Sequence, residues 1–373
     1  MLVDPDTGEL TAVAGPALHA HRQGCTGASE VSEGPDGRSA ESPEVENELF
    51  LQQLETSTEP CVTADDLVAE IRRGRRAVGE AAREAGASAV AMPTAVLVDD
   101  EQDLTPKPRY RRIEAEYGEL ARQALVCAMH VHVDVDGDEE GVAVIDRIRP
   151  WLPVLIALSA NSPYWRGADT RHASWRSQIW SRWPTGGPQE PFGDVAGYRR
   201  TAARMMEWGA SLDAGMLYFD VRLSESFPTV EIRVADVCTE VDDALLLALL
   251  ARALTETAAR DWRAGTEPPA YRADLLRVAS WRAGRFGLGG PLVHPLRGER
   301  AETREVVAAL LDHVGPALED SAETELVRDL FEQMVSRGGG ATRQRRVFER
   351  TGELRAVVHD LVQRTEESWS DPG

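Results

Sequence analysis

The sequence PTVEIRVADVC at residues 228–238 predicts a β-strand from Thr229 to Val237. Residues 216–223 are predicted to pair with this strand as a hairpin. Glu231 and Arg233 then lie on the same face, because side chains alternate along a strand. A carboxylate beside a guanidinium suits a site that holds magnesium and an anionic substrate together, and a cross-strand ion pair is the alternative.

A second strand is predicted over residues 126–135, where apolar and polar side chains alternate. His130, His132 and Asp134 lie on one face of this strand, and valines occupy the other. Two histidines at positions i and i+2 can reach one site, where imidazole ligates a metal or donates to phosphate oxygens. A pair of hydrogen-bonded core histidines is the alternative.

Polar side chains also occupy the strand predicted over residues 48–58, which contains Gln52, Gln53 and Glu55. A carboxylate on a half-buried strand is costly unless it is paired or bound to a metal. Glu55 is therefore a candidate metal ligand, and a solvated strand face is the alternative.

Residues 161–184 read NSPYWRGADTRHASWRSQIWSRWP, a long stretch in which arginines stand among tryptophans. Loops of this length in compact proteins are usually functional or disordered, and the tryptophans favour order. Arginines among aromatic rings bind carboxylates, phosphates or ring systems, so this stretch is a candidate substrate-binding segment.

The totals of the 373-residue chain exclude several classes of protein. A net charge of −21 repels phosphate backbones, so nucleic acid is not an expected partner. No apolar run reaches the roughly 18 residues of a membrane span, and the N-terminus lacks the features of a secretory signal. The four cysteines lack CxxC spacing, which favours a reducing cytoplasm over a disulfide framework or a zinc site. Glycine clusters at residues 287–290 and 338–340 have no P-loop lysine and are interpreted as turns.

Strands alternate with helices in the first part of the chain, and the part from residue 241 onward is predicted to be helical. This order predicts an α+β fold. Thr63 to Asp66 resembles a capping box that opens a helix to about Gly86, and Pro150 and Pro153 interrupt a helix over residues 138–160. Residues 24–47 are polar and are predicted to form a flexible loop. The other predicted elements are strands at residues 2–3 and 87–98 and helices at about 110–125, 241–263, 270–286, 301–315, 321–336 and 342–366.

Taken together, these segments resemble the type 2 glutamate–cysteine ligase family, in its carboxylate–amine ligase branch. The likeness covers nearly the whole chain and implies one catalytic domain over residues 1–373. It also implies a glutamine synthetase-like α+β fold: a curved, mainly antiparallel sheet, backed by helices, with a helical C-terminal part at residues 241–366. The most specific motifs are HVHV at 130–133, RPWLPVLIALSANSPYW at 149–165, SWRSQIWSRWPTGGP at 174–188 and PTVEIRVADVC at 228–238.

The resemblance implies a cytoplasmic ligase that depends on ATP and Mg²⁺ and has weak glutamate–cysteine ligase activity. In such enzymes ATP phosphorylates a carboxylate, and an amine displaces the phosphate to leave an amide. The implied partners are small amino acids, with glutamate and cysteine as candidates, and a homodimer is left open. The implied metal ligands are Glu55, Glu231, His130 and His132, of which His130 is the better match among the histidines.

Two arginines match residues that would hold the substrate carboxylate and the transferring phosphoryl group. These implied catalytic residues are Arg176 and Arg233, and Asn161 and Trp183 are implied to shape the substrate site. Asp134 stands where relatives commonly have glycine, which adds a charge near the site.

Relatives typically begin with a strand carrying a GxEEE-like run of metal-binding glutamates, and this sequence begins at Met1 inside the corresponding strand. We therefore expect reduced catalysis, and the alternative is that Glu48 or Glu44, just before the Glu55 strand, substitutes as a ligand. The alternative function is a catalytically impaired protein on the same scaffold, which keeps its affinity for nucleotide or amino acid.

Overall fold

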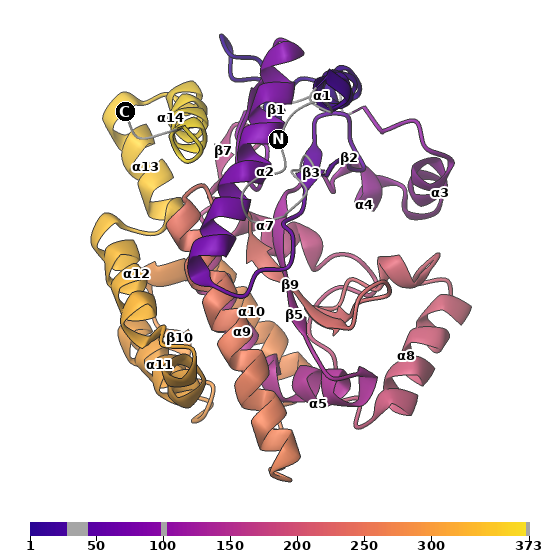
Figure 1. Cartoon of the computed structure of the whole chain (residues 1–373), viewed down its shortest axis with the longest axis vertical. Helices are drawn as coiled ribbons and strands as arrows, with labels where there is room; N and C mark the ends of the chain where they lie inside the picture. Colours follow the sequence, from indigo (N-terminus) through magenta and orange to yellow (C-terminus); the bar gives the residue numbers. More distant parts are fainter. Residues whose placement is uncertain (28–43, 98–102, 371–373) are drawn as a thin grey trace.

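A three-stranded antiparallel sheet carries the longest strands of the computed structural model, which describes residues 1–27, 44–97 and 103–370 (Figure 1). The hairpin and the strand with the two histidines are confirmed. The strands, in their order across the sheet, are β5 (Ala128–Asp134), β9 (Thr229–Asp236) and β8 (Val221–Leu223).

The two faces of this sheet differ in polarity because side chains alternate along each strand. Val230, Ile232 and Val234 of β9 are buried in the main hydrophobic core. Full burial of one such side chain contributes about 1.5–3 kcal/mol, and a slip of one residue would expose all of them. The burial of the apolar face therefore fixes which side chains lie on the opposite face, Glu231 and Arg233 among them. Three helices pack against the strands: α5 (Asp138–Ile148), α6 (Leu152–Ser159) and α9 (Val241–Arg263).

Most of the remaining chain is helical, and the predicted C-terminal helices are confirmed. The helix after Thr63 begins as predicted, since the Thr63 hydroxyl accepts the Asp66 N–H at 3.1 Å. The segment 138–160 breaks at a 3₁₀ turn, Arg149–Trp151, that contains Pro150. Residues 342–366 form two helices because Gly352 adopts a left-handed conformation with φ +72°. The further helices are α1 (Ala14–Gly27), α2 (Ala64–Glu84), α3 (Pro108–Tyr117), α4 (Glu119–Arg122), α7 (Trp175–Trp180), α8 (Val195–Glu207), α10 (Ala273–Phe286), α11 (Thr303–Asp320), α12 (Thr324–Arg337), α13 (Gly340–Thr351) and α14 (Leu354–Glu367).

Several N-terminal predictions were wrong in extent. The loop predicted over residues 24–47 includes the end of α1 and the start of a hairpin, and residues 28–43 lie outside the described part of the chain. The strand predicted over residues 48–58 is shorter because a turn brings the Gln53 N–H to the Phe50 carbonyl at 3.1 Å. The helix α8 was not predicted. The shorter strands are β1 (Leu2–Val3), β2 (Val45–Asn47), β3 (Leu54–Thr56), β4 (Ser88–Ala89), β6 (Tyr164–Trp165), β7 (Ala168–Asp169), β10 (Leu292–Val293) and β11 (Arg300–Ala301).

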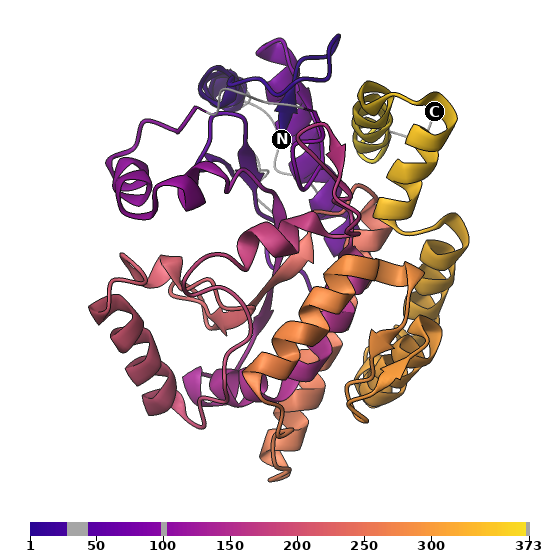
Figure 2. The same ribbon diagram turned by 180° about the vertical axis from the view of Figure 1, so that it is seen from behind.

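The C-terminal helices α11 to α14 lie along one side of the molecule, orange to yellow in Figures 1 and 2. The predicted helical part is confirmed, with the short β10–β11 hairpin between α10 and α11. Among the described residues, no helix combines the length and the apolar character needed to cross a bilayer.

Candidate active site

Glu231 lies at the centre of a charged cluster on the polar face of the sheet. It is 3% exposed, and its carboxylate accepts a hydrogen bond from Arg222 Nε at 2.5 Å and another from Arg233. His130 Nδ1 lies 3.4 Å and His132 Nε2 3.9 Å from the same carboxylate. The structure therefore brings together four of the residues singled out in the sequence, and Arg222 joins them.

The register of the sheet produces this cluster. His132 of β5 and Arg222 of β8 are the cross-strand partners of Glu231, so one row of side chains crosses all three strands. An irregularity in the pairing between Met129 and Val131 falls at His130. The hydroxyl of Thr229 forms a hydrogen bond of 2.9 Å with Nδ1 of His132, which orients the imidazole ring.

The charges of the cluster shift the pKa values of its members. Burial alone would raise the pKa of Glu231, but Arg233 and Arg222 outweigh it and hold that pKa below its usual value. Burial, reinforced by the nearby arginines, holds the pKa of His130 well below its usual range. At neutral pH the site therefore combines an ionised carboxylate, two guanidinium groups and a neutral imidazole.

Glu55 of β3 lies within electrostatic reach of this cluster. Its side chain is exposed, yet desolvation by the surrounding protein and the nearby Glu48 carboxylate raise its pKa to about 7, against the opposing effect of Arg233. The turn that shortens the predicted strand brings Glu48 close to Glu55. Glu55 thus shares Arg233 as a neighbour with Glu231.

Aromatic rings form a support beneath Arg233. Its guanidinium lies 6.0 Å from the ring centroids of both Trp180 and Tyr218. Trp183 is 4% exposed and packs edge-on against Tyr218 at 5.1 Å and against Trp180 at 6.3 Å. Trp183 therefore supports the rings that contact Arg233, and its predicted contact with a substrate stays a prediction.

Arg176 reaches the sheet from α7, and its hydrogen bonds go to the backbone. It is 1% exposed, and its guanidinium donates to the carbonyls of Val234 and Arg233 at 3.0 Å each. Burial lowers its pKa to about 10. These bonds fix β9 at the residue that carries the Arg233 side chain. The predicted contact of Arg176 with a substrate carboxylate stays a prediction.

A buried carboxylate joins three of the motifs. Asp236 is fully buried and accepts hydrogen bonds from the hydroxyls of Ser162 at 2.7 Å and Ser174 at 2.8 Å and from the Asn161 N–H at 2.9 Å. The Ser162 hydroxyl in turn accepts the backbone N–H of Arg176 at 3.0 Å. The long Trp- and Arg-containing stretch is therefore ordered because it is bonded to β9 at several points.

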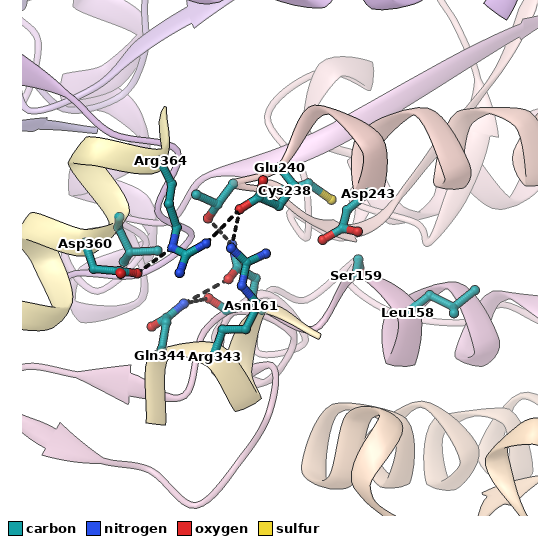
Figure 3. Close-up of a pocket in the computed structure, with 13 residues that line it drawn as sticks. Leu158, Ser159, Asn161, Cys238, Glu240, Asp243, Arg343, Gln344, Asp360 and Arg364 are labelled. Carbon is teal, nitrogen blue, oxygen red and sulfur yellow. Dashed lines mark hydrogen bonds and ion pairs between the residues drawn. The ribbon is translucent and has the colours of Figure 1, made fainter. Parts of the chain in front are cut away.

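Asn161 lines a cavity whose lining residues do not include Arg233 (Figure 3). Its side-chain amide donates to the Val237 carbonyl at 2.9 Å and to Thr239, and Gln344 of α13 donates to its side-chain oxygen. Ion pairs close around this cavity, whose empty volume is about 370 Å³: Arg364 pairs with Asp360 at 2.7 Å, and Arg343 pairs with Glu240. Asn161 therefore joins β9 to the C-terminal helices, and its predicted role in shaping the substrate site stays a prediction.

The predicted metal ligands do not form a preformed metal site. Among the described residues, no three histidine, cysteine, aspartate or glutamate side chains meet in a way that could hold a metal ion. Both oxygens of Glu231 are occupied by arginines. The Glu48 and Glu55 carboxylates fit a divalent cation better, since Mg²⁺ prefers oxygen ligands, and a bound cation would offset both the desolvation and the Glu48 charge that raise the pKa of Glu55.

Sequence reasoning missed Arg222 and Tyr218, and it considered Glu48 only as a substitute metal ligand. Arg222 could have been found by counting back from the turn of the predicted hairpin, since antiparallel pairing places it opposite Glu231. No local pattern marks Tyr218, whose position depends on distant segments.

Comparison with known proteins places these motifs in a wider context. A sequence model described as glutamate-cysteine ligase family 2 matches residues 17–360. A protein of Nocardioides sp. strain JS614, provisionally named glutamate–cysteine ligase 2-1, is 48% identical and covers 100% of this chain and 95% of its own. A protein of the same provisional name from Streptomyces avermitilis is 46% identical and covers 98% and 97%.

The fold is shared with a solved enzyme. The crystal structure of glutamate–cysteine ligase from Francisella tularensis, in complex with AMP, aligns at a TM-score of 0.60 and 11% identity, over 99% of this chain and 87% of that chain. The predicted α+β fold, with a mainly antiparallel sheet backed by helices, is confirmed.

Proposed function

The chain belongs to glutamate–cysteine ligase family 2, and we propose that it is an ATP-dependent ligase that joins a carboxylate to an amine. The names of the relatives support formation of an amide, with glutamate and cysteine as candidate substrates. The absence of CxxC spacing among the cysteines supports the cytoplasm as the compartment. The single observation that carries the proposal is the cluster around Glu231. There Arg233, His130 and His132 offer donors to phosphate and carboxylate oxygens on one face of a rigid sheet.

The proposed reaction has two steps. A carboxylate oxygen attacks the γ-phosphorus of ATP, the bond to ADP breaks, and an acyl phosphate forms. The amine nitrogen then attacks the acyl carbon, phosphate leaves, and the nitrogen loses its proton to a base. Both steps bring negatively charged groups together in the active site. Because the chain itself has a net charge of −21, positively charged side chains are needed there to hold the substrates.

We propose that Arg233 binds the anionic oxygens of the substrates, because a planar guanidinium binds carboxylate or phosphoryl oxygens in a bidentate way. Arg222 keeps Glu231 paired when Arg233 turns part of its fork toward a substrate. His130 donates a hydrogen bond without adding charge, since its low pKa keeps it neutral. Arg176 acts as a positioning residue through the β9 carbonyls.

A divalent cation fits the carboxylates on the Glu55 side of this site. We propose that Glu55, with Glu48, holds Mg²⁺, and that Glu231 joins as a ligand when Arg233 engages a substrate. The bound ion would neutralise charge on the ATP phosphates. His130 and His132 suit phosphate oxygens better than Mg²⁺, which is rarely bound by imidazole.

The second candidate is a protein that binds nucleotide or amino acid without turnover. The observation that favours it is the pairing of both Glu231 oxygens with arginines, which leaves fewer carboxylate oxygens for a metal.

Release of ADP from ATP, measured with Mg²⁺, glutamate and cysteine, tests the proposal. We expect turnover that Arg233→Lys lowers and that the surface variant Arg328→Lys leaves unchanged, since Arg328 pairs only with Glu325 among its charged neighbours in the described structure. ATP binding in calorimetry without ADP release for a panel of acids and amines would favour the second candidate. Failure to bind ATP would contradict the ligase proposal, and failure to bind either ATP or an amino acid would contradict both.

A further inference from the structure

A second cavity lies between α6, α10 and α13, and its lining residues differ from those of the sheet site. It has about 610 Å³ of empty volume. Its floor is apolar and made of small side chains, and the two glycine clusters of the sequence, which lie 51 positions apart, meet at its walls. The lining residues used below are Ala157, Ala160, Ala173, Ala341, Gly287, Gly289, Gly339, Arg285 and Arg345.

The glycines give this cavity its shape. Gly287 has φ +54°, and a Cβ there would lie 2.8 Å from the Cβ of Ala173. Gly338 also has a left-handed conformation, with φ +85°. At Gly289, by contrast, an added Cβ would meet nothing within 4 Å. The walls are therefore close-packed at Gly287 and open at Gly289.

Two arginines form a basic rim. Arg345 is fixed by a bidentate pair with Asp169, at 2.8 and 3.1 Å, and by the His172 carbonyl at 2.9 Å. Arg285 donates to the carbonyl of Arg171, a residue held at φ +59°. Asp169 pairs with Arg345, and Arg285 adds a second positive charge to the rim. The positive charge of the rim also affects His172, whose pKa is lowered by burial and further by Arg285 and Arg345.

We propose that this cavity binds a small organic phosphate, a site separate from the proposed ligase reaction. The phosphate lies on Arg285 and Arg345, because guanidinium groups match phosphate geometry. The carbon part lies on the alanine floor. The first turn of α13, whose N-cap Gly339 provides no side-chain cap, places its positive dipole end at the same end of the cavity, while the Ala341 N–H there donates to the Ala160 carbonyl at 3.1 Å.

Calorimetry with phenyl phosphate at low ionic strength, about 20 mM NaCl, tests the site directly. We expect binding to the full chain that weakens at least 10-fold in Gly289→Glu, because the new carboxylate reaches open space beside the rim and repels phosphate. Gly289→Ala is the matched control and should bind within about 2-fold of the wild type. Arg285→Gln should weaken binding about 5- to 10-fold, and equal thermal unfolding midpoints for the glycine variants confirm that both are folded.

Other outcomes overturn the proposal. One is the absence of binding at millimolar phenyl phosphate, and another is equal affinity of Gly289→Glu and the wild type. Equal binding of phenol would show that the arginine rim has no part in recognition, and equal binding of benzoate would show that the site does not select phosphate. Loss of affinity in Arg233→Lys, with Gly289→Glu unaffected, would assign the probe to the sheet site instead.

Discussion

Replacing Arg176 and Arg233 separately by lysine distinguishes a strand-holding arginine from one that binds substrate. Arg176 makes two charge-assisted bonds to carbonyls, each 3.0 Å long, and a lysine can replace only one. The loss should destabilise the protein by about 1.5–3 kcal/mol. Unfolding entropy of about 2.1 cal/mol/K per residue gives roughly 0.8 kcal/mol/K for 373 residues, so the melting temperature should fall by about 2–4 °C.

Arg233→Lys should have the opposite profile. Glu231 keeps Arg222 as a partner, so stability should change little. Loss of the planar fork should weaken ATP or glutamate binding by roughly 10- to 100-fold, the equivalent of one charge-assisted contact.

The measurements are thermal unfolding and calorimetric titration of ATP and of glutamate, with Arg328→Lys as a matched surface control. An Arg176→Lys protein that melts like the wild type but binds either ligand at least 10-fold more weakly would refute this reasoning. It would show that Arg176 contacts the ligand, as the sequence motif implied.

Three further predictions concern the same site. The affinity for Mg²⁺ should rise between pH 6 and 8, because Glu55, with a pKa of about 7, must lose its proton to bind the cation. In calorimetry, the Glu55→Gln variant should bind Mg²⁺ weakly and show no such rise. Identical pH profiles of Mg²⁺ affinity for the variant and the wild type would contradict the role of Glu55 as a ligand. The imidazole of His130 should titrate below its usual pKa of 6.5 in ¹⁵N NMR. Because its folded pKa lies below its unfolded value of 6.5, stability should fall as pH drops below about 6.5, and less so in His130→Asn; an imidazole that titrates near 6.5 would refute this. Trp183→Ala should cost about 3–5 kcal/mol in chemical denaturation, since the ring is buried among Tyr117, Trp180 and Tyr218, and a variant as stable as the wild type would argue against a supporting role.

The parts of the fold that could be predicted are those with a local pattern. Alternation identified the strand with His130 and His132, and the Thr63 cap identified the start of α2. The turn before Gln53 has no comparable signal, so its segment was read as a continuous strand. The strand predicted over residues 87–98 was too long: apart from β4, residues 87–97 have irregular backbone, which periodicity alone does not distinguish from strand.

The candidate site was predicted in part for a similar reason. Positions on one strand face follow from spacing, so Glu231 and Arg233 could be placed together. The partners of Arg176 and Asn161 are backbone groups of distant segments, and spacing carries no information about them. The raised pKa of Glu55 likewise depends on Glu48, whose proximity arises from a turn that the sequence did not reveal.

The buried carboxylate of Asp236 has a consequence for how the molecule opens. Its hydrogen-bond donors are Asn161, Ser162 and Ser174, which belong to the stretch at residues 161–184. If this stretch left the sheet, the Asp236 carboxylate would be buried without hydrogen-bond partners, which is costly. Loop and strand should therefore form one cooperative unit in local unfolding. In native-state hydrogen exchange, the amide of Asn161 should exchange in step with those of β9, and much more slowly than those of surface loops.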